Sequence, residues 1–203
     1  MTPAKRAFDI VVTLVLGLLL LPLFAILVLA LFIIEGRPIF YISERMRGID
    51  DPFALIKLRT MPVTSGDGGV TGGNKTAILS PFHRLLRRSR ADELPQLWNV
   101  LRGDISLVGP RPPLRRYVEA FPDLYARVLQ SRPGITGLAS LNFHAHEERL
   151  LAACQTPEET DQVYRQRCIP RKARLDLIYQ QRRTICMDVV LIGRTAAKPF
   201  RKG

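Results

Sequence analysis

The 203-residue sequence has only three cysteines and three histidines, and neither set has the spacing of a metal site. Cys154, Cys168 and Cys186 form no CxxC pair, and their odd number does not indicate a disulfide framework. Among the histidines only His144 and His146 lie close together, and no cysteine joins them. The sequence therefore predicts neither a zinc site nor a secreted disulfide scaffold, and a reducing, cytosolic environment fits it best.

Acidic residues are also scarce: 18 Asp and Glu stand against 30 Lys and Arg, a formal net charge of +12. Such an excess implies a polyanionic partner, which can be nucleic acid, anionic lipid or a phosphorylated substrate. The sequence lacks an aromatic RNA-binding motif, zinc-finger spacing, a basic recognition helix and a P-loop. A membrane-anchored nucleic-acid-binding protein thus has only charge in its favour, and a non-catalytic membrane scaffold is the other alternative to an enzyme.

One long segment has no charge at all. Residues 10–34 are almost entirely apolar, and a straight helix of that length covers about 37 Å against roughly 30 Å of bilayer hydrocarbon. Pro22 in its middle predicts a bend over residues 18–22. Because basic residues flank both ends, the positive-inside rule draws both toward the cytoplasm. These patterns leave two possibilities open, a re-entrant helix and a kinked spanning helix.

After the membrane segment, short apolar runs at residues 38–42 and 53–58 predict a β-hairpin around a turn-rich connection. The stretch 65–75 is too rich in glycine for a helix or a central strand, and a flexible loop is predicted there. Residues 92–103 begin with Asp and end at Gly103, which predicts a capped helix whose single apolar stripe is buried against the core or the bilayer.

The C-terminal half yields fewer signals. A helix is predicted over residues 114–130, ended by an Arg-Pro-Gly turn, whereas residues 147–171 are polar and uninformative. Residues 175–196 mix apolar and arginine side chains, which predicts one amphipathic helix, either at an anionic membrane surface or packed on the domain. Trp98, on the apolar stripe of the predicted helix over residues 92–103, is predicted to be a packing residue.

The adjacent carboxylates Asp92 and Glu93 follow three arginines at the predicted start of a helix. Positive neighbours and a helix N-terminus favour ionised carboxylates, and free backbone N–H groups there favour phosphate. Asp92 can then act as a nucleophile while Glu93 holds Mg²⁺ against a diphosphate. Simple helix capping is the alternative. Prolines on both sides of Arg111 predict a rigid phosphate clamp, or else a solvated arginine in a turn.

These motifs, in this order, resemble the monotopic phosphoglycosyl transferases, the bacterial sugar transferase family. The resemblance covers nearly the whole chain and rests on KRAFD, GRPIFYISERMRG, LIKLRTM, VTGGN, SPFHRLLRRSRADELPQLWNVLRGDISLVGPRP, RPGITGLA and LDLIYQQRRTICMDVVLIGRT. The chain is similar to the small members that lack an additional multi-span region. It departs from the family where Leu21 precedes Pro22, where His83 replaces a frequent glycine, and at residues 138–143, where many members read WAQVNG.

The resemblance implies an α+β, mainly α-helical fold, with a re-entrant helix broken at Pro22 over residues 1–36. Residues 37–203 would form a catalytic domain on the cytoplasmic face of the inner membrane, with amphipathic interfacial helices. It implies attack of Asp92 on a UDP-sugar, release of UMP, and transfer of the sugar phosphate to undecaprenyl phosphate. Glu93 and Asp92 would bind Mg²⁺. The remaining residues implied in phosphate or substrate contact are Arg111, Arg88, Arg87, Lys57, Arg59 and Asn142. No nucleic-acid partner is implied.

Overall fold

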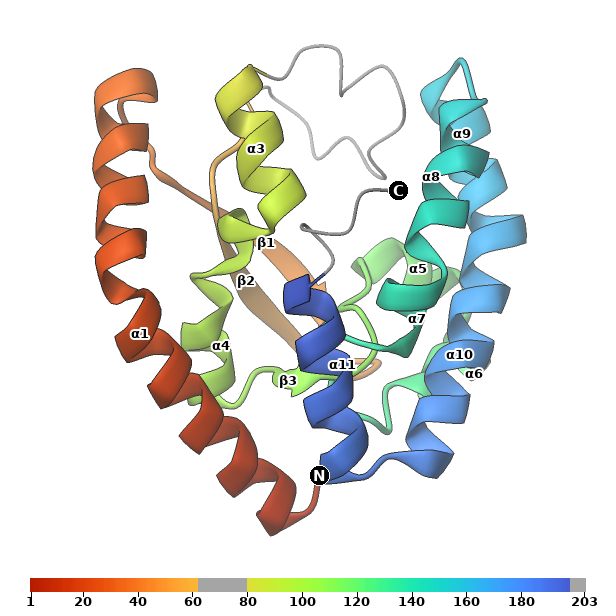
Figure 1. Ribbon diagram of the computed structural model, residues 1–203. Coiled ribbons are helices and arrows are strands. Elements are labelled where there is room, and N and C mark those ends of the chain that lie inside the picture. The colour runs from red at the N-terminus through yellow and green to blue at the C-terminus, as the bar shows by residue number, and fades with distance from the viewer. Residues whose placement is uncertain (62–79, 198–203) are drawn as a thin grey trace.

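The computed structural model describes residues 1–61 and 80–197, and these residues are mainly helical (Figure 1). The described part contains two small two-stranded sheets. The predicted fold class is confirmed in this respect. The glycine-rich stretch 65–75 lies outside the described residues. Helix α1 lies along one side of the molecule and helices α8 to α10 lie along the other, with the strands between them.

Helix α1, Pro3–Glu35, contains the whole charge-free segment. The Thr2 hydroxyl accepts a hydrogen bond from the Lys5 backbone N–H, and Gly36 ends the helix with a φ of 67°. Pro22 lies inside the helix, and the helix axis changes direction near its middle (Figure 1). The predicted bend is therefore present, but the predicted break is not. A single proline removes one backbone donor, and the helix continues past it.

The face of α1 that packs on the rest of the chain is polar over its first three turns. Lys5, Asp9 and Thr13 are buried at intervals of four residues, so they lie on one face. The opposite face consists of exposed valine, leucine, isoleucine and phenylalanine side chains. By length and composition α1 is the one described helix suited to crossing a membrane. An apolar outer surface of this extent is typical of contact with lipid.

Strands β1, Phe40–Met46, and β2, Pro52–Leu58, form an antiparallel hairpin in which Phe40 pairs with Leu58. The second predicted strand is confirmed, whereas the first extends four residues beyond its predicted end, into the stretch read as turn. The turn itself is tight because Arg47 closes it. Its backbone N–H and its guanidinium both bond to Asp51, at 2.8 Å.

Strands β3, Ser106–Val108, and β4, Gly134–Thr136, pair in parallel. Neither was predicted, because three residues are too short to show a periodic pattern. Glycine is required at this crossing. A Cβ on Gly109 would lie 2.2 Å from the Arg132 carbonyl oxygen, and one on Gly134 would lie 2.2 Å from the Gly109 nitrogen. The crossing brings the GPRP turn and the RPGITG segment together.

The segment around the carboxylate pair is built from three short pieces. They are helix α3, Pro81–Ser89, a 3₁₀ turn at Ala91–Glu93, and helix α4, Gln96–Arg102. The predicted helix over residues 92–103 is therefore wrong in its first turn, although its end at Gly103, with a φ of 88°, is confirmed. The buried face of α4 carries Gln96, Asn99 and Val100. Trp98, predicted to pack, is 57% exposed.

The predicted helix over residues 114–130 is two helices, α5, Arg115–Ala120, and α6, Pro122–Val128. Phe121 separates them with a φ of −137°, because a residue before proline avoids the helical region. The remaining helices are α7, Leu138–Asn142, α8, His144–Ala152, α9, Pro157–Val163, the π-helical turn Tyr164–Cys168, α10, Ile169–Arg182, and α11, Ile185–Ala197.

The predicted single helix over residues 175–196 is thus also two helices, since Arg183 adopts an extended backbone with a ψ of 130°. The amphipathic character predicted for this region is present in α11. Asp188 and Leu191 face inward, while Ile185, Val189 and Val190 are exposed. The inward face contributes Leu191 to a core cluster with side chains of β2, α4, β3 and α10. α11 therefore offers an apolar outer surface of its own.

Candidate active site

Asp92 and Glu93 lie on the 3₁₀ turn between α3 and α4 because the chain changes direction at Arg90. Arg90 adopts a left-handed conformation, with a φ of 58°, and its N–H donates to Arg87 O at 3.1 Å. The Glu93 N–H then donates to Arg90 O at 3.1 Å, which closes the tight turn. Both carboxylate residues are buried, at 8% and 7% exposure. The turn therefore presents two buried acids side by side.

Three basic side chains hold the Glu93 carboxylate. Arg90 Nη2 donates to Oε2 at 2.6 Å, Arg111 Nη1 to Oε1 at 3.3 Å, and Lys57 Nζ lies 3.7 Å from Oε1. Burial alone would raise the pKa of Glu93, but these three cations outweigh it and lower the pKa to about 2. Arg90 is itself tied to the Ile135 carbonyl oxygen at 2.9 Å. Glu93 is thus a fixed, permanently ionised group.

Asp92 is held differently. Its carboxylate accepts no hydrogen bond from the described side chains, so the alternative of a helix cap does not apply. Burial and the charge of Glu93 raise its pKa, against the opposing effects of Lys57, Arg111 and Arg87. The prediction that basic neighbours favour the ionised form therefore holds for Glu93, but for Asp92 burial prevails. A more basic carboxylate with no hydrogen bond from its neighbours is the better nucleophile of the two.

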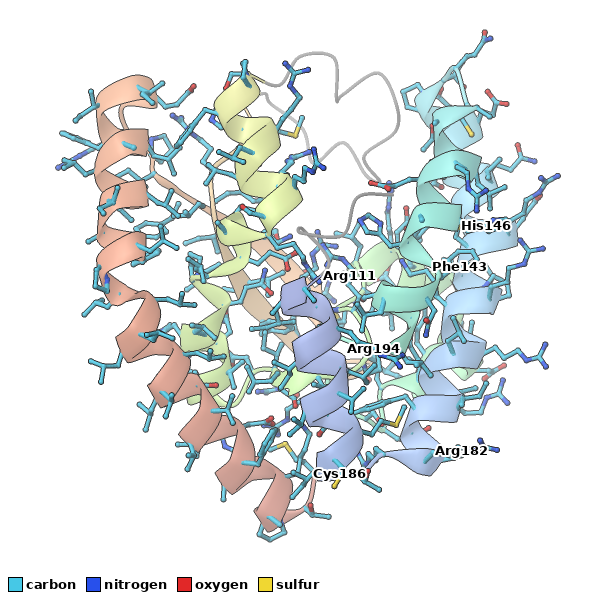
Figure 2. All side chains as sticks on the ribbon, in the orientation of Figure 1. Arg111, Phe143, His146, Arg182, Cys186 and Arg194 are labelled. Carbon is cyan, nitrogen blue, oxygen red and sulfur yellow. The ribbon has the colours of Figure 1, made fainter. Side chains whose placement is uncertain are left out.

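Lys57 and Arg111 border a narrow recess beside the pair, whose lining is Arg45, Leu55, Lys57, Gln96, Arg111 and Pro112. Burial and Arg111 lower the pKa of Lys57 to about 8, although Glu93 and Asp92 oppose the shift. The Arg111 side chain is 43% exposed, and Figure 2 shows it in the middle of the molecule. A guanidinium that bonds to Glu93 through Nη1 and is otherwise partly exposed can bind an anion with its remaining N–H groups.

The other predicted contact residues are scattered. The Arg87 Nε donates to Thr60 Oγ1 at 2.9 Å and lies within electrostatic reach of Asp92. Arg88 is exposed on α3. Arg59 bonds to the Glu35 carbonyl oxygen at 2.9 Å, at the end of α1. Asn142 is exposed and bonds within its own helix, to Leu138 O. The fold thus gathers Lys57, Arg87 and Arg111 around the pair, and places the other three elsewhere.

Sequence reasoning missed two features of the site. The first is the ion pair between Arg90 and Glu93, which their spacing of three residues could have indicated. The second is a polar cluster of Glu147, Tyr164 and Lys172 near Arg111, of which the first two belong to the stretch found uninformative. No sequence signal could have found it, because its members come from α8, the π-helical turn and α10.

Two carboxylates are the donor set that Mg²⁺ prefers when substrate phosphates and water complete its shell. The described residues contain no group of three or more candidate metal ligands. The Asp92 oxygens suit such a shared site because they accept no hydrogen bond from the described residues, whereas Glu93 already accepts from two arginines and has less capacity left for a metal ion. The chain would therefore supply part of a coordination shell and rely on the substrate for the rest.

A buried carboxylate pair, four surrounding cations and a membrane-length helix define a membrane-associated enzyme for anionic substrates. Similarity to known protein sequences specifies this class further. The chain belongs to the bacterial sugar transferase family, whose sequence model matches residues 1–202. The family identified from the motifs is thereby confirmed.

Curated relatives agree with this assignment. The chain is 33% identical over 195 residues to a UDP-glucose:undecaprenyl-phosphate glucose-1-phosphate transferase of Caulobacter vibrioides, covering 94% of this chain and 67% of that protein. It is 40% identical over 140 residues to the uncharacterized sugar transferase EpsL of Bacillus subtilis, covering 68% of each. A Klebsiella pneumoniae UDP-glucose:undecaprenyl-phosphate glucose-1-phosphate transferase is 30% identical over 97% of this chain and 40% of its own length.

Proposed function

We propose that this enzyme transfers a sugar phosphate from a UDP-sugar to undecaprenyl phosphate, giving an undecaprenyl diphosphate sugar and UMP. The observation that carries the proposal is the unequal carboxylate pair: cations fix Glu93 and lower its pKa, whereas burial raises the pKa of Asp92, which accepts no hydrogen bond from the described side chains. The surrounding basic side chains suit a diphosphate. The activities named for the Caulobacter and Klebsiella relatives support this substrate class.

In the first step an Asp92 carboxylate oxygen attacks the β-phosphorus of the UDP-sugar. The bond between that phosphorus and the bridging oxygen breaks, and UMP leaves with the electron pair. The phosphosugar stays on Asp92 as an acyl phosphate ester. Arg111 and Lys57, which both approach Glu93 Oε1, would neutralise the charge of the diphosphate.

In the second step a phosphate oxygen of undecaprenyl phosphate attacks the same phosphorus. The bond to the Asp92 oxygen breaks, which restores the carboxylate and releases the product. Glu93 and Asp92 would hold Mg²⁺, which reduces the repulsion between an anionic nucleophile and an anionic diphosphate. Because Glu93 is fixed by Arg90 and Arg111, it keeps its position through both steps.

The test is UMP release by the purified enzyme in detergent or nanodiscs, with undecaprenyl phosphate, Mg²⁺ and a panel of UDP-sugars. UMP and lipid-linked sugar are expected in equal amounts for at least one donor. Release of UDP in place of UMP would contradict the proposal, because it would mean transfer of the sugar without its phosphate. The panel also identifies the sugar.

Lys57 gives a pH dependence with a definite sign. Its pKa of about 8 means that the ammonium is present below pH 8 and is lost as the pH rises through that value. We expect kcat/KM for the donor to fall above pH 8, since this parameter reports ionisations of the free enzyme. In Lys57→Arg the guanidinium stays charged, so the alkaline fall should disappear from the profile. An unchanged profile in that variant would assign the fall to another group.

The re-entrant path of α1 is the second part of the proposal, and the contacts of both helix ends support it. At the N-terminal end Lys5 pairs with Asp188 of α11 at 2.9 Å. At the other end Glu35 accepts from Arg59 and lies 3.6 Å from His83 Nε2. A helix that crossed the bilayer would carry one end away from a domain on the opposite side. Two ends attached to the same domain fit a helix that enters and leaves on the cytoplasmic face.

Cysteine labelling tests this topology. In a background without native cysteines, Ala4→Cys reports the N-terminus and Asp123→Cys reports the catalytic domain, since both positions are exposed. We expect a membrane-impermeant maleimide to label neither site in intact spheroplasts and both after lysis. Labelling of Ala4→Cys alone in intact cells would mean that the helix spans the membrane.

A further inference from the structure

A polar cluster lies on the side of Arg111 away from α1 and takes no part in the steps above. Lys172 Nζ of α10 donates to both Glu147 carboxylate oxygens of α8, at 3.1 Å each, and to the Tyr164 hydroxyl at 3.2 Å. The two charged side chains are only 12% and 17% exposed. The Lys172 ammonium also lies 5.0 Å from the centre of the Tyr164 ring. The cluster is therefore compact and partly desolvated.

The backbone at Tyr164 is unusual. Residues 164–168 form a π-helical turn between α9 and α10, a local distortion that proteins frequently place at functional sites. A second tyrosine gives a contrast. The Tyr117 ring lies 5.0 Å from that of Tyr164, yet its hydroxyl donates to Asp161 at 2.7 Å. Two neighbouring tyrosines thus direct their hydroxyls to different partners, Tyr164 to Lys172 and Tyr117 to a separate ion-pair cluster.

The cluster is electrostatically connected to the site. Glu93 raises the pKa of Arg111 most, burial opposes it, and Glu147 and Tyr164 add to the rise. The pKa of Lys172 is raised: burial and the charge of Arg111 lower it, but Tyr164 and Glu147 together outweigh them. Arg111 thus lies within electrostatic reach of both Glu93 and this cluster. A donor whose diphosphate is bound by Arg111 would have a hydroxylated group available to this cluster.

The surface around the cluster is suited to a water-soluble ligand. From residue 99 to residue 177 the protein exposes no large hydrophobic side chain, whereas α1, Trp98 of α4 and the outer face of α11 expose many. The lipid substrate therefore belongs on the side of α1 and α11. Figure 2 shows Phe143 and His146 on the opposite side of Arg111 from α1, in the region that carries Glu147.

We propose that Glu147, Tyr164 and Lys172 bind the hydroxyl groups of the nucleotide-sugar donor and so contribute to its selection. The inference rests on the proposed function and adds specificity residues to it. A carboxylate accepts hydrogen bonds from hydroxyls, an ammonium donates them, and a phenol does both. The hydroxylated group is either the hexose or the ribose, and these two share the chemistry.

The experiment measures donor binding directly, by calorimetry with the full-length Asp92→Asn enzyme, so that no donor is consumed. Tyr164→Phe and Lys172→Met are compared with Tyr117→Phe, the matched control, whose hydroxyl faces Asp161. Tyr164→Phe should weaken UDP-sugar binding about three- to tenfold, and Lys172→Met about ten- to a hundredfold. Tyr117→Phe should leave it unchanged, at a similar melting temperature.

Titrations with UMP and UDP distinguish the two groups. If the hexose is held, the variants lose affinity for UDP-sugars alone; if the ribose is held, they lose affinity for UMP and UDP as well. Either result supports the inference. Affinities that match those of Tyr117→Phe for every ligand would overturn it while leaving UMP release, and with it the proposed function, intact. Absence of UDP-sugar binding by the parent Asp92→Asn protein would overturn the inference as well.

Discussion

Replacement of Asp92 by asparagine is expected to reduce UMP release by about 10³-fold or more. The amide has nearly the shape of the carboxylate but cannot attack phosphorus, so the covalent step is lost while the fold is kept. Because the Asp92 carboxylate is buried beside Glu93, its neutralisation relieves the cost of burial and the repulsion from Glu93. The variant should therefore melt at or above the temperature of the wild-type enzyme.

The measurement has two parts, UMP release without the lipid acceptor and turnover with it. UMP is first quantified with the donor but without undecaprenyl phosphate, where the wild type should release at most one equivalent and gain the mass of a phosphosugar. Asp92→Asn should show neither. Asp123→Asn, at an exposed position on α6, is the control that removes an aspartate elsewhere. Turnover by Asp92→Asn within tenfold of the wild type would rule out the covalent route.

Replacement of Glu93 is expected to reduce activity for a different reason. In Glu93→Gln the arginines at 90 and 111 and Lys57 lose the anion that they share, so the cations themselves are displaced. A loss of activity in that variant reports on the arrangement of the site and does not identify a nucleophile. This difference follows from the hydrogen bonds of the two acids, which adjacent positions in the sequence cannot reveal.

The membrane helix, the second strand of the hairpin, the end of α4 and the carboxylate pair could all be predicted from the sequence, because each depends on a local pattern. The helix boundaries that failed depend on single backbone residues, such as Phe121 before Pro122 and Arg183 after α10. Strands of three residues carry no periodicity, and β3 and β4 form because two glycine segments approach closely.

The contacts within the site were the least predictable. Burial raises the pKa of Asp92 above the value expected from its basic neighbours, and burial is a property of the folded chain. Arg59, two residues after Lys57, would share its face if the strand continued, but β2 ends at Leu58 and Arg59 bonds to the end of α1 instead. The tertiary structure thus decided which basic residues surround the acids.

The largest effect on stability is expected at Lys5, which joins α1 to the domain. Its ammonium lies 2.8 Å from Asp9 Oδ1 and 2.9 Å from Asp188 Oδ2, and both aspartates are almost completely buried. Ser106 and Tyr179 donate to the remaining oxygens of these carboxylates, at 2.7 Å each. The network is satisfied only while the ammonium is present, since it holds two anions and one cation.

Lys5→Met should therefore lower the free energy of unfolding by about 3–5 kcal/mol, because it leaves two buried carboxylates without a cation. The measurement is denaturant unfolding of the enzyme in a fixed detergent. Arg115→Met is the matched control: it breaks the Arg115–Glu44 pair, whose side chains are 45% and 53% exposed, and should cost less than about 1 kcal/mol. Lys5→Met combined with Asp188→Asn should recover part of the loss, because only one buried charge then remains unpaired. Equal losses in Lys5→Met and Arg115→Met would mean that the buried network does not hold α1 to the domain.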